Sequence, residues 1–286
     1  MSKTMERVAV ITGGNKGIGF SIVKGLCKIF KGKVYLTARN EELGRQAVEK
    51  LKEVGYNPEF YQLDITVAQS RDNFAKYLKE TYGGLDVLVN NAGIAFKVAS
   101  RAPFSQQATE TVETNFYGTL RLCEVLFPLL RPHARVVNLS SSCGHLSKIP
   151  EGPQREKFAD KNLTIEGLIK IVENFKSAAA EGKSEEKGFG CSAYNVSKVA
   201  VSALTFIQQK LLLNDPRPGI IVNCVHPGYV DTDMTSHKGP LTPDEGAEAS
   251  IMLATLPENA SRPKGDYVWY DGKIYDWNSP TPTPIQ

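Results

Sequence analysis

VAVITGGNKGIG at residues 8–19 joins a run of small apolar residues to a glycine-rich turn. The apolar run predicts a buried strand, and the residues after the glycines predict the start of a helix. Glycine permits positive φ and close approach of the backbone to a ligand, while free N–H groups at a helix N-terminus attract an anion. The turn is therefore a candidate phosphate-binding loop, formed by Gly13, Asn15, Lys16, Gly17, Ile18 and Gly19.

Similar apolar runs recur along the chain and are separated by amphipathic stretches. Strands are predicted at Val8–Thr12, Lys33–Ala38, Glu59–Gln62, Val87–Asn90, Arg135–Ser140, Ile220–Val225 and Tyr267–Tyr270. Helices are predicted at Ile18–Phe30, Glu41–Val54, Ala68–Tyr82, Gln107–Leu130 and Tyr194–Leu213. Because each helix can return the chain to the same sheet edge, the pattern predicts an α/β fold, a doubly wound Rossmann sheet of about seven parallel strands flanked by helices.

One long segment interrupts this alternation. Roughly forty residues, 150–190, separate the fifth predicted strand from the Tyr194 helix, far more than a usual connection. Part of this segment carries a helical apolar stripe, formed by Leu168, Ile171, Val172 and Phe175. We expect a helical insertion before the Tyr194 helix, within one domain spanning residues 1–286. Residues 278–286 alternate proline with threonine or isoleucine, which predicts an extended and flexible tail.

The composition and charge exclude several classes of protein. The 34 basic and 31 acidic residues are spread along the whole chain and give a net charge of +3, so no nucleic-acid-binding face is predicted. The chain becomes apolar only at Val8 and meets glycine at Gly13, too soon for a signal segment or spanning helix, so a cytoplasmic location without membrane contact is expected. The 5 cysteines form no CxxC pair, and the 4 histidines are scattered, so we expect reduced thiols and no metal site.

The end of the second predicted strand indicates which dinucleotide would bind. Enzymes that bind NAD typically place an acidic residue there, but this chain has Arg39. Its planar guanidinium can pair with a 2′-phosphate, and Lys16 in the glycine loop adds a second positive charge. NADPH is therefore the predicted cofactor. The alternative is that both residues are solvated surface cations.

Tyr194 and Lys198 form a candidate proton-donating pair. They are four residues apart in a predicted helix, so both side chains project from one face. A free tyrosine has a pKa near about 10, too high for efficient proton transfer at neutral pH, and a nearby ammonium stabilises the phenolate. We expect Lys198 to lower the pKa of Tyr194. Taken alone, this spacing also fits a half-buried aromatic residue on a structural helix.

Several motifs together resemble the short-chain dehydrogenase/reductase family. They are TGGNKGIG, the NNAG of residues 90–93, Ser141, and the YNVSK of residues 194–198, and the resemblance covers nearly the whole chain. Within the family, NKGIG, LDVLVNNAGIAFKV and the long insertion are most similar to the monomeric animal carbonyl reductases. Many members pair through helices that an insertion at this place would cover, so the resemblance implies a monomer.

The resemblance assigns roles to further residues. Asn115 would hold a water that relays protons, Lys198 would bind the nicotinamide ribose, and Ser141 would hold the carbonyl oxygen beside Tyr194. Because residues 140–142 are all serine, Ser140 remains the alternative to Ser141. The family's remaining cofactor contacts match Arg39, Asp64, Ile65, Asn91, Ala92, Gly93, Pro227, Gly228, Val230 and Thr232.

The expected reaction is NADPH-dependent reduction of a small-molecule ketone, aldehyde or quinone to an alcohol. The substrate cleft is expected to be lined by Phe96, Lys97, Val98, Gln106 and Tyr229, whose aromatic faces suit apolar carbonyl compounds. In related enzymes this region also receives glutathione conjugates, and Lys97 is the candidate partner for their carboxylate. Two other functions remain open: a non-catalytic NADPH-binding regulatory protein, and a dehydrogenase of a steroid or secondary alcohol.

Overall fold

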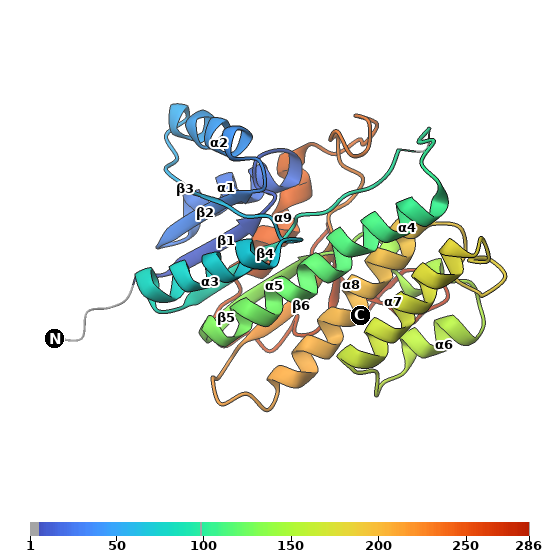
Figure 1. Cartoon of the computed structure of the whole chain (residues 1–286). Helices are drawn as coiled ribbons and strands as arrows, with labels where there is room; N and C mark the ends of the chain where they lie inside the picture. Colours follow the sequence, from blue (N-terminus) through green and yellow to red (C-terminus); the bar gives the residue numbers. More distant parts are fainter. Residues whose placement is uncertain (1–5, 98, 286) are drawn as a thin grey trace.

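A nine-stranded sheet forms the centre of the protein, in a computed structural model that describes residues 6–97 and 99–285 (Figure 1). The strand order is β3-β2-β1-β4-β5-β6-β7-β8-β9, and β1 to β7 run parallel. Their bounds are β1 Val8–Thr12, β2 Lys33–Ala38, β3 Glu59–Gln62, β4 Leu85–Asn90, β5 Leu130–Leu139, β6 Ile221–His226 and β7 Tyr267–Trp269. All seven predicted strands are confirmed, and the doubly wound Rossmann architecture with them.

Helices cover both faces of this sheet. On one face Ala9 and Ile11 pack with α1 (Gly17–Ile29), α2 (Glu41–Glu53) and α9 (Pro243–Ala254). Their neighbours Val8 and Val10 point to the opposite face, against α3 (Ala68–Tyr82) and α5 (Thr119–Leu126). β1 is buried on both faces because alternate side chains enter two different cores, which explains its continuous apolar sequence.

The order of the strands locates the ligand-binding edge. The chain winds outward from β1 to β3 and then returns to place β4 on the other side of β1. Open parallel sheets bind ligands at the carboxyl ends of the strands where the winding reverses, here between β1 and β4. The glycine loop follows β1, the NNAG segment follows β4, and the serines follow β5. The topology therefore brings these three motifs to one edge.

The helix predicted at Gln107–Leu130 is divided in the structure. α4 (Phe104–Val112) passes into a π-helical turn (Glu113–Gly118), then into α5, and a short 3₁₀ turn ends where β5 begins at Leu130. A π-helical turn adds one residue to a turn of the helix and changes the spacing of apolar residues very little. The periodicity of the sequence therefore did not reveal the π-helical turn. Pro128, which has no N–H to donate, lies in the 3₁₀ turn and helps to end the helix early.

The insertion is helical, as predicted. It contains α6 (Pro153–Ala159) and α7 (Ile165–Ala180), and Thr164 caps α7 by accepting a hydrogen bond from the Gly167 N–H. The predicted stripe of α7 is buried, and it packs against α4 and α8 (Ala193–Leu212). In Figure 1, α6 and α7 lie beside α4 and α8 at one side of the molecule. The insertion thus adds an outer layer to this face.

The carboxyl-terminal residues add to the sheet, which the sequence did not predict. β8 (Ile274–Asp276) pairs antiparallel with β7, and β9 (Thr283–Pro284) pairs antiparallel with β8, so the sheet gains two strands beyond the predicted seven. The tail is extended, as expected, but it is paired with the sheet. β7 would otherwise end the sheet with unpaired N–H and C=O groups, and the two short strands satisfy part of that edge. Trp269 and Tyr275 stack across it with ring centroids 4.2 Å apart.

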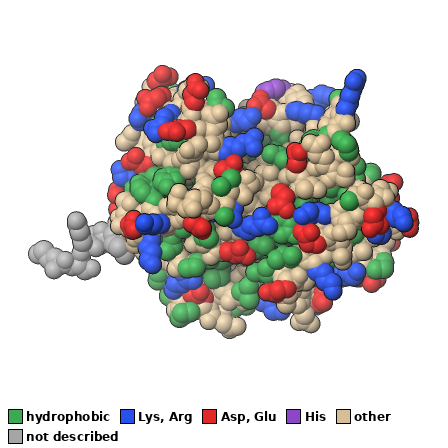
Figure 2. Space-filling model, in the orientation of Figure 1, with side chains coloured by type: hydrophobic (Ala, Val, Ile, Leu, Met, Phe, Trp, Pro, Cys, Tyr) green, Lys and Arg blue, Asp and Glu red, His purple; other side chains and the backbone are tan. Residues whose placement is uncertain are grey.

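Acidic and basic side chains are interspersed on the face drawn in Figure 2 and form no large field of one sign.

None of the helices in residues 6–97 and 99–285 combines the length and apolarity needed to span a bilayer.

Candidate active site

The glycine loop has the backbone conformation that its sequence predicts. Gly13 and Gly17 adopt φ of +63° and +55°, which are unfavourable for other residues. A Cβ on Gly19 would lie 2.4 Å from the carbonyl oxygen of Gly13, so only glycine lets the first turn of α1 approach the loop this closely. No side chain in the described part of the chain caps the N-terminus of α1 at Lys16. The N–H groups of its first turn are thus available to a phosphate.

The NNAG segment is bonded directly to the glycine loop. The Asn91 side-chain amide donates to the carbonyl oxygens of Thr12 (2.8 Å) and Gly13 (3.0 Å). The Thr12 hydroxyl accepts hydrogen bonds from the N–H groups of Asn91 (3.0 Å) and Ala92 (2.9 Å). These four bonds hold the ends of β1 and β4 together. Thr12, the first residue of the TGG motif, was not predicted as a site residue, although its hydroxyl organises both loops.

The residues predicted to hold the adenine end of a dinucleotide lie along this same edge. Arg39 is exposed at the end of β2 and makes no ion pair within the described part of the chain. Asp64 accepts hydrogen bonds from the N–H (2.9 Å) and hydroxyl (2.6 Å) of Thr66, and the next residue, Ile65, is buried. Lys16 is instead paired with Asp233, with 2.7 Å between Nζ and Oδ2. These features fit an NADPH molecule. The Arg39 guanidinium could meet its 2′-phosphate, and the glycine loop with the uncapped N-terminus of α1 could meet its other phosphates.

Tyr194 and Lys198 project from the same face of α8, as predicted. The Lys198 Nζ lies 5.7 Å from the centroid of the Tyr194 ring and donates a 2.7 Å hydrogen bond to the carbonyl oxygen of Leu139. Ser192 caps the start of α8 by accepting from the Asn195 N–H, which fixes the first turn that carries Tyr194. The ammonium is buried, with only 6% of the residue exposed. Buried charges of this kind are uncommon outside functional sites.

Burial governs the acidity of both side chains. It raises the pKa of the Tyr194 phenol above its usual range; the Cys143 thiol adds to this effect and the Ser141 hydroxyl opposes it. Burial lowers the pKa of Lys198 to about 8, with Cys143 opposing the shift. Burial therefore outweighs any lowering of the Tyr194 pKa by Lys198, and the role of Lys198 in setting that pKa stays a prediction. The low-polarity surroundings penalise the phenolate as well as the ammonium, and the ammonium is bonded to Leu139.

The two candidate serines have different surroundings. The Ser140 hydroxyl is buried and is 2.7 Å from the hydroxyl of Ser202, with a longer contact of 3.3 Å to the Lys198 carbonyl oxygen. The Ser141 side chain is half-buried, close enough to Tyr194 to influence its pKa, and accepts one hydrogen bond from the Cys143 N–H (3.1 Å). This geometry favours Ser141 as the residue beside Tyr194, while Ser140 helps to pack α8 against β5.

Asn115 lies in the π-helical turn and is buried. Its side chain bonds both backbone groups of Ile94, accepting from the N–H (2.8 Å) and donating to the carbonyl oxygen (2.9 Å), and it also donates to the Ser197 hydroxyl (3.0 Å). A Cβ on Gly93 would lie 3.1 Å from the Asn115 side-chain oxygen and 3.8 Å from the Lys198 Nζ. Asn115 therefore joins Ile94, the residue after the NNAG segment, to α8 next to Lys198. The proton-relay role stays a prediction.

The chain after β6 returns to the glycine loop. Gly228 has φ of +87°, which turns the chain after Pro227, and Val230 is buried. A Cβ on Gly17 would lie 3.2 Å from the Thr232 methyl group, so Thr232 lies directly over the loop. The structure thus brings the predicted contacts at 227–232 to the same edge as the glycines. Met234, which the sequence argument omitted, has its sulfur 4.0 Å from the Tyr194 hydroxyl.

The predicted substrate residues are only partly brought together. Phe96 and Lys97 line a hollow of about 460 Å³ formed by residues 94–97, 99 and 100, and Tyr229, three residues after β6, is 50% exposed. Gln106 is exposed on α4 and donates to Glu110 (2.7 Å), so its amide lies along the helix surface instead of lining that hollow. Val98 is outside the described residues. A second groove, of about 450 Å³ between α6, α8 and β8, contains none of the predicted site residues.

Comparisons with known proteins show which family this chain resembles. Residues 7–152 match the sequence profile of a family described as short chain dehydrogenase. The chain is 44% identical over 280 residues to carbonyl reductase 1 (NADPH) of Pongo abelii, covering 97% of this chain and 100% of the relative. It is 44% identical to the Homo sapiens protein of the same name, over 94% of this chain and 98% of the relative.

Solved structures show the same likeness in three dimensions. Salutaridine reductase from Papaver somniferum superposes with a TM-score of 0.83 and 34% identity, over 93% of this chain and 99% of the other. Menthone neomenthol reductase from Mentha piperita gives a TM-score of 0.78 and 30% identity, again over 93% and 99%.

Proposed function

Because this chain belongs to the short-chain dehydrogenase family, we propose that it is an enzyme that reduces ketones, aldehydes or quinones to alcohols with NADPH. Membership confirms the resemblance seen in the motifs. The relatives named carbonyl reductase (NADPH) support both the reaction and the cofactor. One observation of this structure carries the proposal: Tyr194, Lys198 and Ser141 meet at the sheet edge where the glycine loop and the NNAG segment are bonded together.

The residues divide the work of the reduction between them. NADPH supplies, when bound, the hydride that reduces the carbonyl carbon. The Tyr194 hydroxyl donates its proton to the carbonyl oxygen, and its raised pKa keeps that proton in place until negative charge develops on the oxygen. The Ser141 hydroxyl donates a hydrogen bond to the same oxygen and stabilises that charge. Tyr267 donates a 2.6 Å hydrogen bond to the Ser141 carbonyl oxygen, which fixes the serine backbone.

Lys198 provides a positive charge at the base of the site. With a pKa of about 8 it is protonated at neutral pH and yet able to exchange a proton. It opposes the build-up of negative charge on Tyr194 once the phenol has lost its proton. Asn115, bonded to Ile94 and Ser197 nearby, would hold the water that returns a proton to this pair.

The cofactor preference is assigned to Arg39 and Lys16. Arg39 is exposed at the end of β2, where the adenine ribose of a dinucleotide lies in Rossmann folds. Consumption of NADPH and of NADH should be followed in parallel with menadione, an aromatic ketone and a long-chain aldehyde. We expect the rate with NADPH to exceed the rate with NADH by about tenfold or more. NADH lacks the 2′-phosphate and would leave the two cations without their charged partner. Equal rates with both cofactors would remove the role of the two cations.

This assay, run also in the direction of alcohol oxidation with NADP⁺, separates the two alternative functions. A non-catalytic regulatory protein would bind NADPH but consume none of it with any substrate. A dehydrogenase of a steroid or secondary alcohol would reduce NADP⁺ with the alcohol faster than it consumes NADPH with the ketone. The convergence of Tyr194, Lys198 and Ser141 favours an enzyme over a regulatory protein, because simple binding of a dinucleotide needs no proton donor beside a serine hydroxyl.

Binding of glutathione conjugates forms part of the proposal. The Lys97 ammonium bonds backbone oxygens of the 233–236 segment, so a conjugate's carboxylate would have to compete with those groups. The Lys97→Ala variant should raise the Michaelis constant for a glutathione conjugate by more than that for menadione, since only the conjugate has a carboxylate to pair with the ammonium. An unchanged constant for the conjugate would contradict the role of Lys97.

The state of the chain in solution is also proposed. We infer one domain over residues 1–286 that acts as a monomer, because α7 covers α4 and α8 with a buried apolar stripe. Light scattering during gel filtration should give a mass near 31.4 kDa, and a value twice as large would contradict the monomer. A cytoplasmic location is part of the same proposal and would be tested by cell fractionation.

A further inference from the structure

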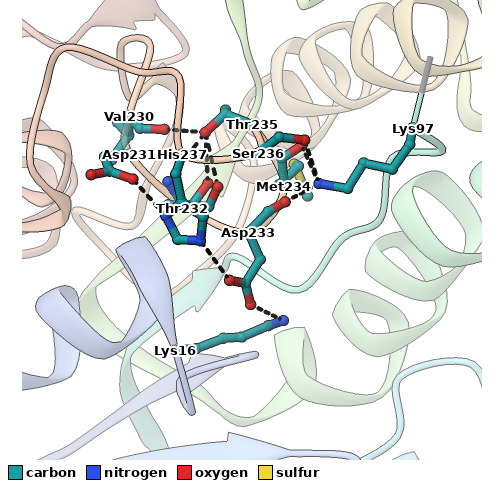
Figure 3. Close-up of polar contacts among 10 residues, drawn as sticks. All are labelled: Lys16, Lys97, Val230, Asp231, Thr232, Asp233, Met234, Thr235, Ser236 and His237. Atoms are coloured by element: carbon teal, nitrogen blue, oxygen red, sulfur yellow. Dashed lines mark hydrogen bonds and ion pairs between the residues drawn. The ribbon is translucent and has the colours of Figure 1, made fainter. Parts of the chain in front are cut away.

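Two lysines from distant parts of the chain hold the segment of residues 231–237, which we name the clasp segment (Figure 3). The Lys16 ammonium is 2.7 Å from the Asp233 carboxylate. Lys97 donates to the carbonyl oxygens of Asp233 and Met234 (3.3 Å for the latter) and to the Ser236 hydroxyl (3.0 Å). Figure 3 shows the two ammonium groups approaching the segment from different sides. The segment is therefore tied to the glycine loop and to the segment that follows β4.

The Asp233 carboxylate is shared between two contacts of the clasp segment, with Lys16 and with His237. His237 contacts two carboxylates, Asp231 through Nδ1 (2.7 Å) and Asp233 through Nε2 (3.2 Å). Lys16 and His237 hold the pKa of the Asp233 carboxyl below its usual value. Ser236 and His237 adopt φ of +55° and +58°, a conformation that costs energy for residues other than glycine. This local fold persists only while surrounding contacts compensate for that strain.

The position of the clasp segment matters for the substrate. Met234 belongs to it, and its sulfur is 4.0 Å from the Tyr194 hydroxyl. A carbonyl oxygen that accepts the Tyr194 proton must lie within hydrogen-bond reach of that hydroxyl. Met234 therefore stands beside the place that the substrate needs.

We propose that Asp233 is a positioning residue that competes with the 2′-phosphate of NADPH for Lys16, so that binding of the phosphate releases the clasp segment and withdraws Met234 from Tyr194. This inference rests on the proposed cofactor site, in which Lys16 and Arg39 hold the 2′-phosphate. NADH lacks the phosphate and leaves the Lys16–Asp233 pair intact.

The strength of the Lys16–Asp233 pair suits such an exchange. Both side chains are well exposed, 67% for Lys16 and 60% for Asp233, so water and salt screen the pair and it is easily broken. A phosphate carries more negative charge than a carboxylate, and Arg39, assigned to the same phosphate, would add a second cation for it. Moving Lys16 from Asp233 to the phosphate is therefore favourable, and it removes one of the two lysine ties from a segment in which Ser236 and His237 are strained.

Binding of two small nucleotides tests the competition without any catalysis. Adenosine 2′,5′-bisphosphate carries the phosphate in question, and 5′-AMP lacks it. Calorimetry should show that Asp233→Asn binds the bisphosphate about two- to fivefold more tightly than the wild type, the range of an exposed ion pair, with unchanged binding of 5′-AMP. Asp231→Asn is the matched control, because Asp231 contacts His237 and makes no contact with Lys16. Equal tightening in both variants, or none in Asp233→Asn, would overturn the proposal.

Hydrogen–deuterium exchange tests the release of the segment. In the wild type, the bisphosphate should speed exchange at the amides of residues 232–238, and 5′-AMP should not. In Asp233→Asn, these amides should exchange quickly before any ligand is added. Slower exchange on binding the bisphosphate would overturn the proposal, because it would mean that the phosphate tightens the segment.

A third variant separates failure of this proposal from failure of the cofactor site. Lys16→Gln should weaken binding of the bisphosphate by about tenfold relative to 5′-AMP, as expected when a charged hydrogen bond is lost. If Lys16→Gln has this effect and Asp233→Asn has none, the exchange is wrong and the cofactor site stands. If Lys16→Gln binds both nucleotides like the wild type, the role of Lys16 in the cofactor site is wrong as well.

Discussion

Replacing Lys198 by methionine should stabilise the protein while destroying its activity. Burial lowers the pKa of Lys198 from 10.5 to about 8, so the folded protein holds its proton less tightly than the unfolded chain does. Each pKa unit corresponds to about 1.4 kcal/mol, which makes the cost of the buried charge about 3 kcal/mol at pH 7. The variant also loses the hydrogen bond to the Leu139 carbonyl oxygen, worth about 1 kcal/mol. The net gain in the free energy of unfolding is about 2 kcal/mol.

The gain should depend on pH in a defined direction. Below the folded pKa of about 8, Lys198 is charged in both states and the full cost is present. Between about 8 and 10.5 the unfolded chain keeps the proton while the folded protein releases it, so wild-type stability rises with pH relative to the variant. Above this window the lysine is neutral in both states. The variant's advantage should therefore fade from pH 8 upward.

Urea unfolding of both proteins at pH 7 and at pH 10 measures this difference. Lys210→Met, at an exposed lysine on the same helix, is the matched control and should change stability by less than about 0.5 kcal/mol. A variant at Lys198 that is less stable than the wild type at pH 7, or one whose advantage is the same at both pH values, would refute the reasoning.

Two further substitutions test the glycine loop and the insertion. In Gly19→Ala the new Cβ would lie 2.4 Å from the Gly13 carbonyl oxygen, so we expect a loss of about 1–3 kcal/mol in the free energy of unfolding together with weaker NADPH binding, measured by urea unfolding and calorimetry. Wild-type affinity in that variant would show that the loop need not be so close. Phe175→Ala removes a fully buried ring of α7 and should cost about 3–5 kcal/mol by urea unfolding while NADPH binding persists; a cost below 1 kcal/mol would mean that the insertion is not part of the core.

Much of the fold follows from local sequence patterns. The parallel strands are predictable because burial on both faces leaves continuous runs of Val, Ile and Leu, as in Val8–Thr12. The π-helical turn at Glu113–Gly118 was not predictable, because the apolar spacing of its residues stays close to that of an α-helix. β8 and β9 were missed because they are very short, and they form through pairing with an edge that only the assembled sheet presents.

The site shows the same division between local and long-range information. The glycine loop and the Tyr194–Lys198 pair were predictable because backbone conformation and helical spacing are local properties. The raised pKa of Tyr194 was not predictable, because it depends on burial by residues from several elements. The Lys16–Asp233 pair joins residues 217 positions apart, and nothing in the sequence alone indicates it.

The most direct test of the account is NADPH consumption with menadione by the wild type and by Tyr194→Phe, which keeps the ring and lacks only the hydroxyl. Loss of a proton donor should lower kcat by about 10²–10⁴-fold, while the affinity for NADPH, measured by calorimetry, stays within about twofold. Equal kcat values in the two proteins would contradict the assignment of Tyr194 as the acid.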